Sequence, residues 1–209
     1  MTILALEFSS ARRSVALARD GIVLSEAVDQ TGERGTGAFG LIEKVLASAK
    51  HSRAEIQTIA VGLGPGSYTG IRAAIAVAQG WQLARGLNLL GVSSVESLAV
   101  VAQAEKLFGR VNLVIDAQRG EFYLATWEIS GERRQEISPL KIVSADELAA
   151  RLAAGEICAG PEMERALFPS AAAAAQLASG RVDFLAGEKL EPVYLRETSF
   201  VKAPPGRAF

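Results

Sequence analysis

Residues 3–28 read ILALEFSSARRSVALARDGIVLSEAV, and this stretch decides the fold. Three short apolar runs cover residues 3–8, 14–19 and 22–28. A small polar turn separates the first two runs, and Asp20-Gly21, a dipeptide typical of hairpins, separates the last two. The stretch therefore predicts three strands joined by tight turns, an arrangement that forms an antiparallel meander.

Helix and strand patterns alternate after the meander, and the same plan then begins again. The apolar periodicity predicts helices over residues 38–49, 71–86 and 95–106, with strands over 58–63 and 88–92 between them. From residue 111 onward we expect strands at 111–115, 121–129 and 156–160. A helix should follow Ser144 as its N-cap, and an alanine-rich helix should cover 171–178. The repeat predicts a duplicated α/β fold of the βββαβα type in two lobes, residues 1–108 and 109–209.

Composition excludes several classes of function. The 209 residues include 22 Lys and Arg, 23 Asp and Glu, one Cys and one His. A net charge of −1 disfavours direct nucleic-acid binding, and the single Cys158 excludes an internal disulfide. The single His51 excludes most histidine-based catalysis and metal sites. We expect a cytoplasmic protein without a membrane span, because no apolar run is long enough and no charged leader precedes the first strand.

The most distinctive segment is the glycine-rich loop over residues 64–70, between a predicted strand and a predicted helix. Its glycines Gly64 and Gly66 allow close backbone approach, and Thr69 could cap the helix. Together with Ser67, these residues could cradle a phosphate or carboxylate at the helix N-terminus. The alternative is a tight turn without a ligand, and the segment is not a P-loop, because no Gly-Lys-Ser/Thr follows.

Two acids, Glu7 and Asp116, stand near the ends of corresponding strands in the two halves. Carboxylates in these places could flank a cleft, hold a metal through water, or act as acid and base. Alternatively, each carboxylate ends its strand and accepts hydrogen bonds from the turn that follows it.

The helix predicted over residues 71–86 is apolar on every face, whereas an ordinary surface helix keeps a polar face. Ala76, Gly80 and Ala84 form a row of small residues at spacing four, which allows another helix to approach closely. Because a chain of this length offers few elements to cover the helix, we expect a second protein to cover it. In the absence of that partner, a homodimer through the same helix is the natural substitute.

Four segments together resemble the TsaB (YeaZ) family over essentially the whole chain. They are residues 1–6 (MTILAL) leading to Ser9, 64–72 (GPGSYTGIR), 116–123 (DAQRGEFY) and 191–196 (EPVYLR). The resemblance implies an actin/Hsp70-like ATPase (ASKHA) fold and a role in making N6-threonylcarbamoyladenosine in tRNA. It further implies a non-catalytic subunit that binds the threonylcarbamoyl-transferring subunit TsaD, in a complex that the small ATPase TsaE completes.

The chain departs from the family pattern in two places. Glu7 stands where relatives usually carry Asp, and residues 33–36 (ERGT) lack the His that many have at the start of the first helix. The metal-binding His-x-x-x-His motif of TsaD-like proteins is also missing, which disfavours a metallopeptidase. We therefore expect no cofactor and no metal, with tRNA contacted only through the complex. A small nucleotide-dependent phosphotransferase or ATPase using Glu7, Asp116 and the glycine-rich loop is the alternative.

The expected partner surface lies on the first two helices. Its candidate residues are Leu41, Val45, Arg72, Ala73, Ala76, Val77, Gly80, Trp81 and Ala84.

Overall fold

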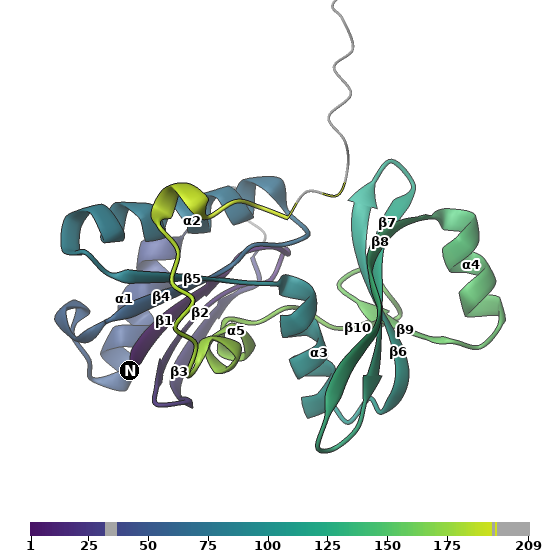
Figure 1. Cartoon of the computed structure of the whole chain (residues 1–209), viewed down its shortest axis with the longest axis horizontal. Coiled ribbons are helices and arrows are strands. Elements are labelled where there is room, and N and C mark those ends of the chain that lie inside the picture. The colour runs from purple at the N-terminus through teal and green to yellow at the C-terminus, as the bar shows by residue number, and fades with distance from the viewer. Residues whose placement is uncertain (32–36, 194, 196–209) are drawn as a thin grey trace, which may run out of the picture.

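The computed structural model describes residues 1–31, 37–193 and 195, and shows two lobes, each built on a five-stranded sheet (Figure 1). The strand order is β3-β2-β1-β4-β5 in the first sheet and β8-β7-β6-β9-β10 in the second. In both sheets the central strand pairs antiparallel on one side and parallel on the other. The expected α/β class and the duplicated plan in two lobes are thereby confirmed.

The first sheet begins with the predicted meander. Strand β1 pairs antiparallel with β2 and parallel with β4, so the meander lies at one edge of the sheet. The elements of this half are β1 (Thr2–Glu7), β2 (Arg13–Arg19), β3 (Ile22–Asp29), α1 (Ala38–Ala49), η1 (Arg53–Glu55), β4 (Thr58–Gly62), α2 (Tyr68–Arg85), β5 (Asn88–Val92) and α3 (Ser94–Ala104).

The second half contains two strands that the sequence pattern did not indicate, β8 and β10. Its elements are β6 (Gly109–Gln118), β7 (Glu121–Ile129), β8 (Arg134–Ser144), α4 (Ala145–Ala153), β9 (Ile157–Gly160), β10 (Arg165–Ala166), α5 (Ala171–Ala178) and η2 (Gly187–Lys189). Ser144 caps α4 as expected, because its hydroxyl accepts a hydrogen bond from the Glu147 backbone N–H at 3.2 Å.

Alternating side chains place helices on both faces of the first sheet. Leu4 and Leu6 of β1 point to the face covered by α1 and α2, whereas Ile3 and Ala5 point to the face covered by α5. The alanines of α5 let this helix lie close to the sheet (Figure 1). Helix α3 packs on the second sheet and also contacts α5, so it joins the two lobes.

The chain returns to the first lobe after β10. Helix α5 packs on the first sheet, and Leu185 pairs with Leu89 at the free edge of β5. The expected division at residues 108 and 109 therefore follows the order of the chain but not its packing, because residues 171–190 lie against the first lobe. Tyr194 and Arg196 of the motif at residues 191–196 lie outside the described residues, as do residues 33–36.

Within the described residues, no helix combines the length and the apolar character that crossing a membrane would require.

Candidate functional site

Glu7 is the last residue of β1, and its side chain is fully buried. It accepts hydrogen bonds from the Ser9 backbone N–H at 2.9 Å and from the Ser94 hydroxyl at 3.0 Å. A Cβ atom on Gly62 would stand 2.1 Å from its Oε2 atom, so glycine at position 62 leaves the room that the longer Glu side chain needs. Burial raises the pKa of Glu7, and the hydrogen bonds from Ser9 and Ser94 oppose this rise.

The glycine-rich loop is tied to its own chain. Ser67 N–H donates to the Ser9 carbonyl at 2.6 Å, and Gly64 N–H donates to the Ser94 hydroxyl at 3.1 Å. Gly66 has φ +144°, and a Cβ atom there would stand 2.1 Å from the Ser9 carbonyl oxygen. Gly66 therefore serves the close approach of the loop to the turn after β1, which is what a tight turn without a ligand requires.

The cap of α2 differs from the expected one. The helix begins at Tyr68, three residues before the predicted start, and Ser67 is its N-cap. The Ser67 hydroxyl accepts from the Gly70 N–H at 3.3 Å, whereas Thr69 is exposed within the first turn. The expectation that Thr69 could cap the helix was wrong. Ser67, which precedes Thr69 by two residues, already offers a hydroxyl to the N–H group three residues later, so the helix begins at Tyr68.

Asp116 lies near the end of β6 and bonds within its own turn. Its carboxylate accepts from the Gln118 backbone N–H at 2.7 Å and from the Gln118 side-chain amide at 2.6 Å. Its acidic neighbour is Glu162, whose pKa is raised by burial and further by the Asp116 carboxylate, while the Asp116 backbone N–H lowers it. Both Glu7 and Asp116 thus bond the turns that follow them. Among the described residues, no three His, Cys, Asp or Glu side chains are grouped so that they could hold a metal ion.

The outer face of α2 carries the row of small residues. Ala76, Gly80 and Ala84 are exposed, and a Cβ atom on Gly80 would meet nothing within 4 Å. Leu83 lies on the same side of the helix and is 89% exposed. An exposed leucine beside three residues without bulky side chains forms a flat, open face. We call Ala76, Gly80, Leu83 and Ala84 the α2 face.

The flank of α2 is covered by the chain itself. The Gln79 side-chain amide donates to the Gly187 carbonyl at 2.8 Å, and Gly187 N–H donates to the Gln82 side chain at 2.7 Å. Val77 and Trp81 are partly buried against the core. The expectation that this helix is apolar on every face was wrong, because Gln79 and Gln82 form a polar flank. The surroundings of α2 are therefore divided between the sheet, the segment around η2, and the open α2 face.

Two of the nine expected partner-surface residues lie elsewhere. Leu41 and Val45 of α1 belong to the hydrophobic core, with 6% and 0% exposure, because the apolar stripe of α1 faces the sheet. On the outer side of α1, Phe39 is 57% exposed, and no sequence pattern singled it out. Arg72 is exposed and lies over the Tyr68 ring, 5.3 Å from its centroid, while Ala73 is half-buried.

Replacing Glu7 by glutamine should change how stability depends on pH. Since burial raises the pKa of Glu7, the folded chain keeps a proton that the unfolded chain releases above the ordinary value of 4.5. The free energy of unfolding of the unchanged chain therefore falls as pH rises through this window. Glu7→Gln lacks this titration. Relative to the unchanged chain it should gain stability with rising pH, by at most about 1.4 kcal/mol per pH unit.

Urea unfolding of both chains at a series of pH values from about 5 to about 8 measures this difference. A difference that stays constant over the series would show that Glu7 is already ionised throughout in the folded chain.

Comparison with known proteins gives a consistent result. The family model for TsaD, tRNA N6-adenosine threonylcarbamoyltransferase, matches residues 21–185, which is more than half of the chain. The chain is 34% identical over 128 residues to the tRNA threonylcarbamoyladenosine biosynthesis protein TsaB of Escherichia coli (strain K12). It is 27% identical over 140 residues to TsaB of Bacillus subtilis (strain 168).

These matches cover 61% and 66% of this chain, and only 55% and 60% of the two relatives. A crystal structure from Pseudomonas aeruginosa, described as an uncharacterized protein with similarity to peptidase YeaZ, superimposes with a TM-score of 0.80 at 28% identity. That superposition covers 93% of this chain and 99% of the other. The chain therefore belongs to the family that the TsaD model describes, and its resemblance to TsaB (YeaZ) proteins is confirmed.

Proposed function

We propose that this chain acts in tRNA threonylcarbamoyladenosine biosynthesis as a non-catalytic subunit. It binds a TsaD-like threonylcarbamoyltransferase and stabilises the active conformation of that enzyme, in a complex that also includes a TsaE-like ATPase. The similarity to the TsaB proteins of Escherichia coli and Bacillus subtilis supports this pathway. Alone, the chain forms a homodimer through the surface that its partner would cover.

The α2 face is the observation that carries the proposal. A helix surface of Ala76, Gly80 and Ala84 lets a partner backbone come close, and Leu83 supplies apolar area that water now covers. When a partner covers this face, each Å² of apolar surface removed from water contributes about 25 cal/mol to the free energy of binding. The partner thus gains affinity from shape and burial, and no reacting group of this chain is needed.

The geometry near Glu7 supports a subunit without chemistry of its own. A phosphotransferase would need the Glu7 carboxylate or the loop donors to face a ligand. Instead the carboxylate accepts bonds from Ser9 and Ser94, and the Gly64 and Ser67 N–H groups donate within the chain. A nucleotide would have to displace several of these bonds at once.

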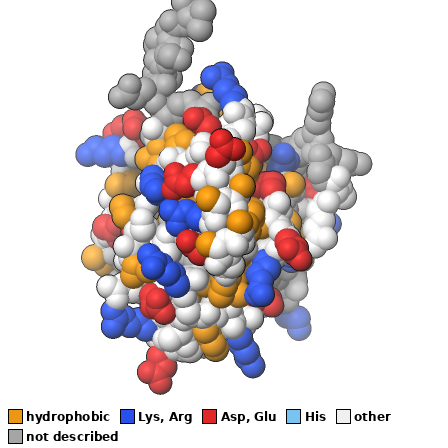
Figure 2. Space-filling view, turned by 90° about the vertical axis from the view of Figure 1, so that its right-hand side faces the viewer, with side chains coloured by type: hydrophobic (Ala, Val, Ile, Leu, Met, Phe, Trp, Pro, Cys, Tyr) orange, Lys and Arg blue, Asp and Glu red, His pale blue; other side chains and the backbone are white. Residues whose placement is uncertain are grey.

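Charge supports contact with tRNA only through the complex. The net charge is −1, so the chain lacks the general attraction to phosphates that a tRNA-binding subunit shows. Figure 2 shows basic and acidic side chains interspersed over the outer face of the second lobe, where a phosphate backbone would meet both signs. The basic surface for tRNA is accordingly expected on the partner.

Mixing the chain with the TsaD-like protein from the same genome should give a stable heterodimer in size-exclusion chromatography with light scattering. The chain alone, at micromolar concentration, should run as a dimer of the 22.0 kDa subunit. Calorimetry of the chain alone with ATP and Mg²⁺ should give no heat of binding. Separate elution of the two proteins would contradict the proposal, and micromolar ATP binding by the chain alone would favour the phosphotransferase.

A further inference from the structure

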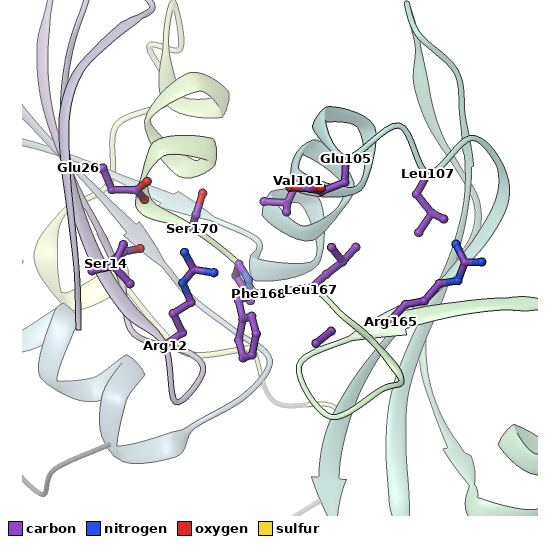
Figure 3. Close-up of a pocket in the computed structure, with 13 residues that line it drawn as sticks. Arg12, Ser14, Glu26, Val101, Glu105, Leu107, Arg165, Leu167, Phe168 and Ser170 are labelled. Atoms are coloured by element: carbon purple, nitrogen blue, oxygen red, sulfur yellow. The ribbon is translucent and has the colours of Figure 1, made fainter. Parts of the chain in front are cut away.

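A cavity of about 480 Å³ lies between the two lobes, on the side of β3 (Figure 3). Its walls come from the start of β2, from β3, from the C-terminal half of α3, and from residues 165–170, which lead the chain back to the first lobe. None of its lining residues is Glu7, Asp116 or part of the glycine-rich loop. The volume is within the range of small-molecule sites, and nothing described so far uses it.

Four charged side chains line the cavity: Arg12, Glu26, Glu105 and Arg165. Glu26 already has a role in the fold, because its carboxylate accepts from the Ala172 N–H at 3.1 Å, at the start of α5. The two positive and two negative charges balance. A cavity with no net charge favours a ligand without net charge over a simple anion or a simple cation.

Three of these charges, Arg12, Glu105 and Arg165, form no ion pair with any described residue, and of the two arginines only Arg12 also lies over an aromatic ring. Arg12 lies over the Phe168 ring, 5.8 Å from its centroid, and forms no ion pair with any described residue. Glu105, on the other wall, forms none either.

Apolar side chains line the same cavity. Figure 3 shows Val101 above, Leu167 and Phe168 below, and Arg12 and Glu105 coming from different elements around them. Because Arg12 and Glu105 line one cavity without pairing, a ligand that carries a carboxylate and an ammonium group can satisfy both. The apolar lining then accommodates the rest of such a ligand.

We propose that this cavity binds a free α-amino acid with an apolar side chain. The ligand carboxylate is held by the Arg12 guanidinium, which the Phe168 ring holds in place, and the ammonium group is held by Glu105. The side chain lies against Val101 and Leu167. Because the walls come from both lobes, the bound ligand bridges them.

Three related probes separate the two charge contacts: L-phenylalanine, N-acetyl-L-phenylalanine and L-phenylalanine amide. The acetyl group removes the ammonium charge, and the amide removes the carboxylate, while the ring stays the same. In NMR titrations of the full chain, L-phenylalanine should bind, and each derivative should bind about five-fold more weakly or worse. Absence of L-phenylalanine binding at millimolar concentration, or equal affinity for all three probes, would overturn the proposal.

Two substitutions assign the contacts to residues. Arg12→Gln and Glu105→Gln change exposed side chains, so the fold should be unaffected. Arg12→Gln should weaken binding of L-phenylalanine about five-fold but leave the amide unaffected, and Glu105→Gln should act likewise with the acetyl derivative. Arg110→Gln, an exposed arginine outside the cavity, is the matched control and should change no affinity by more than about two-fold. Equal losses with all probes, or none, would place the ligand elsewhere.

Discussion

A Gly80→Leu variant added to a reconstituted threonylcarbamoyladenosine-forming system should leave most of the tRNA unmodified, as omission of the chain would. The reason is the open position of Gly80. A leucine there projects from the α2 face into the space where we propose that the partner helix packs. Mass spectrometry of the nucleosides from the tRNA measures the product, and size-exclusion chromatography of the same variant measures partner binding.

The folded chain itself should tolerate this leucine. A Cβ atom on Gly80 meets nothing within 4 Å, so the side chain enters solvent in the free protein. Leucine is also a better helix former than glycine, by roughly 0.5 to 1 kcal/mol. The free energy of unfolding should therefore stay equal or rise slightly while modification is lost. That combination separates a lost interface from a damaged fold.

Two other variants complete the test. A chain with Glu7→Gln, Asp116→Asn and Ser67→Ala should restore modification, because in our proposal these residues position no reacting group. Lys106→Leu places a leucine at an exposed position outside α2 and serves as the control for added apolar surface. If the triple variant binds the partner normally but leaves tRNA unmodified, the chain contributes to the chemistry, and the subunit is not merely a scaffold.

The elements that the sequence predicted are those with a strong local pattern. These are the apolar runs of the meander, the hairpin at Asp20-Gly21 and helix α1 with its buried stripe. In each of them the residue types and their spacing over a few neighbouring positions are enough to define the element. Strand β8 lacks such a pattern, because it is an edge strand whose residues are mostly exposed. Pro139 also interrupts it, at a place where the pairing with β7 is irregular.

The site was predictable only in part, for a related reason. Apolar periodicity shows that one face of a helix is buried, and it correctly identified the buried stripe that contains Leu41 and Val45. It does not show whether that face packs on the protein's own sheet or on a partner, and here it packs on the sheet. The segment around η2 covers one flank of α2 from about 105 residues away in sequence, as the contact of Gln82 with Gly187 shows. Likewise, the cavity between the lobes unites residues from four separate parts of the chain.

The same substitution at two glycines of α2 should have opposite effects on stability. Gly70→Ala should lower the free energy of unfolding by about 1 to 3 kcal/mol, and Gly80→Ala should raise it by up to about 1 kcal/mol. Both positions are helical, so the gain in helix propensity is common to the two. The difference comes from what each new methyl group meets.

At Gly70 the methyl group would stand 2.0 Å from the carbonyl oxygen of Phe8. That atom belongs to the backbone of the turn after β1, which also holds the hydrogen bonds from Ser9 to Glu7 and from Ser67 to Ser9. To relieve this clash the first turn of α2 must move away from the sheet, and that movement disrupts the buried contacts of Ile71. A rotated side chain could not give this relief.

Urea unfolding followed by circular dichroism measures both variants against the unchanged chain, with equal dependence on urea required before the free energies are compared. If Gly70→Ala is as stable as the unchanged chain, the loop has room at Gly70. Its glycines would then need another cause, such as the approach of an anion to the start of α2. If Gly70→Ala is destabilised and Gly80→Ala is not, the two glycines serve different purposes: one lets the loop pack against its own chain, and the other leaves the α2 face open for a partner.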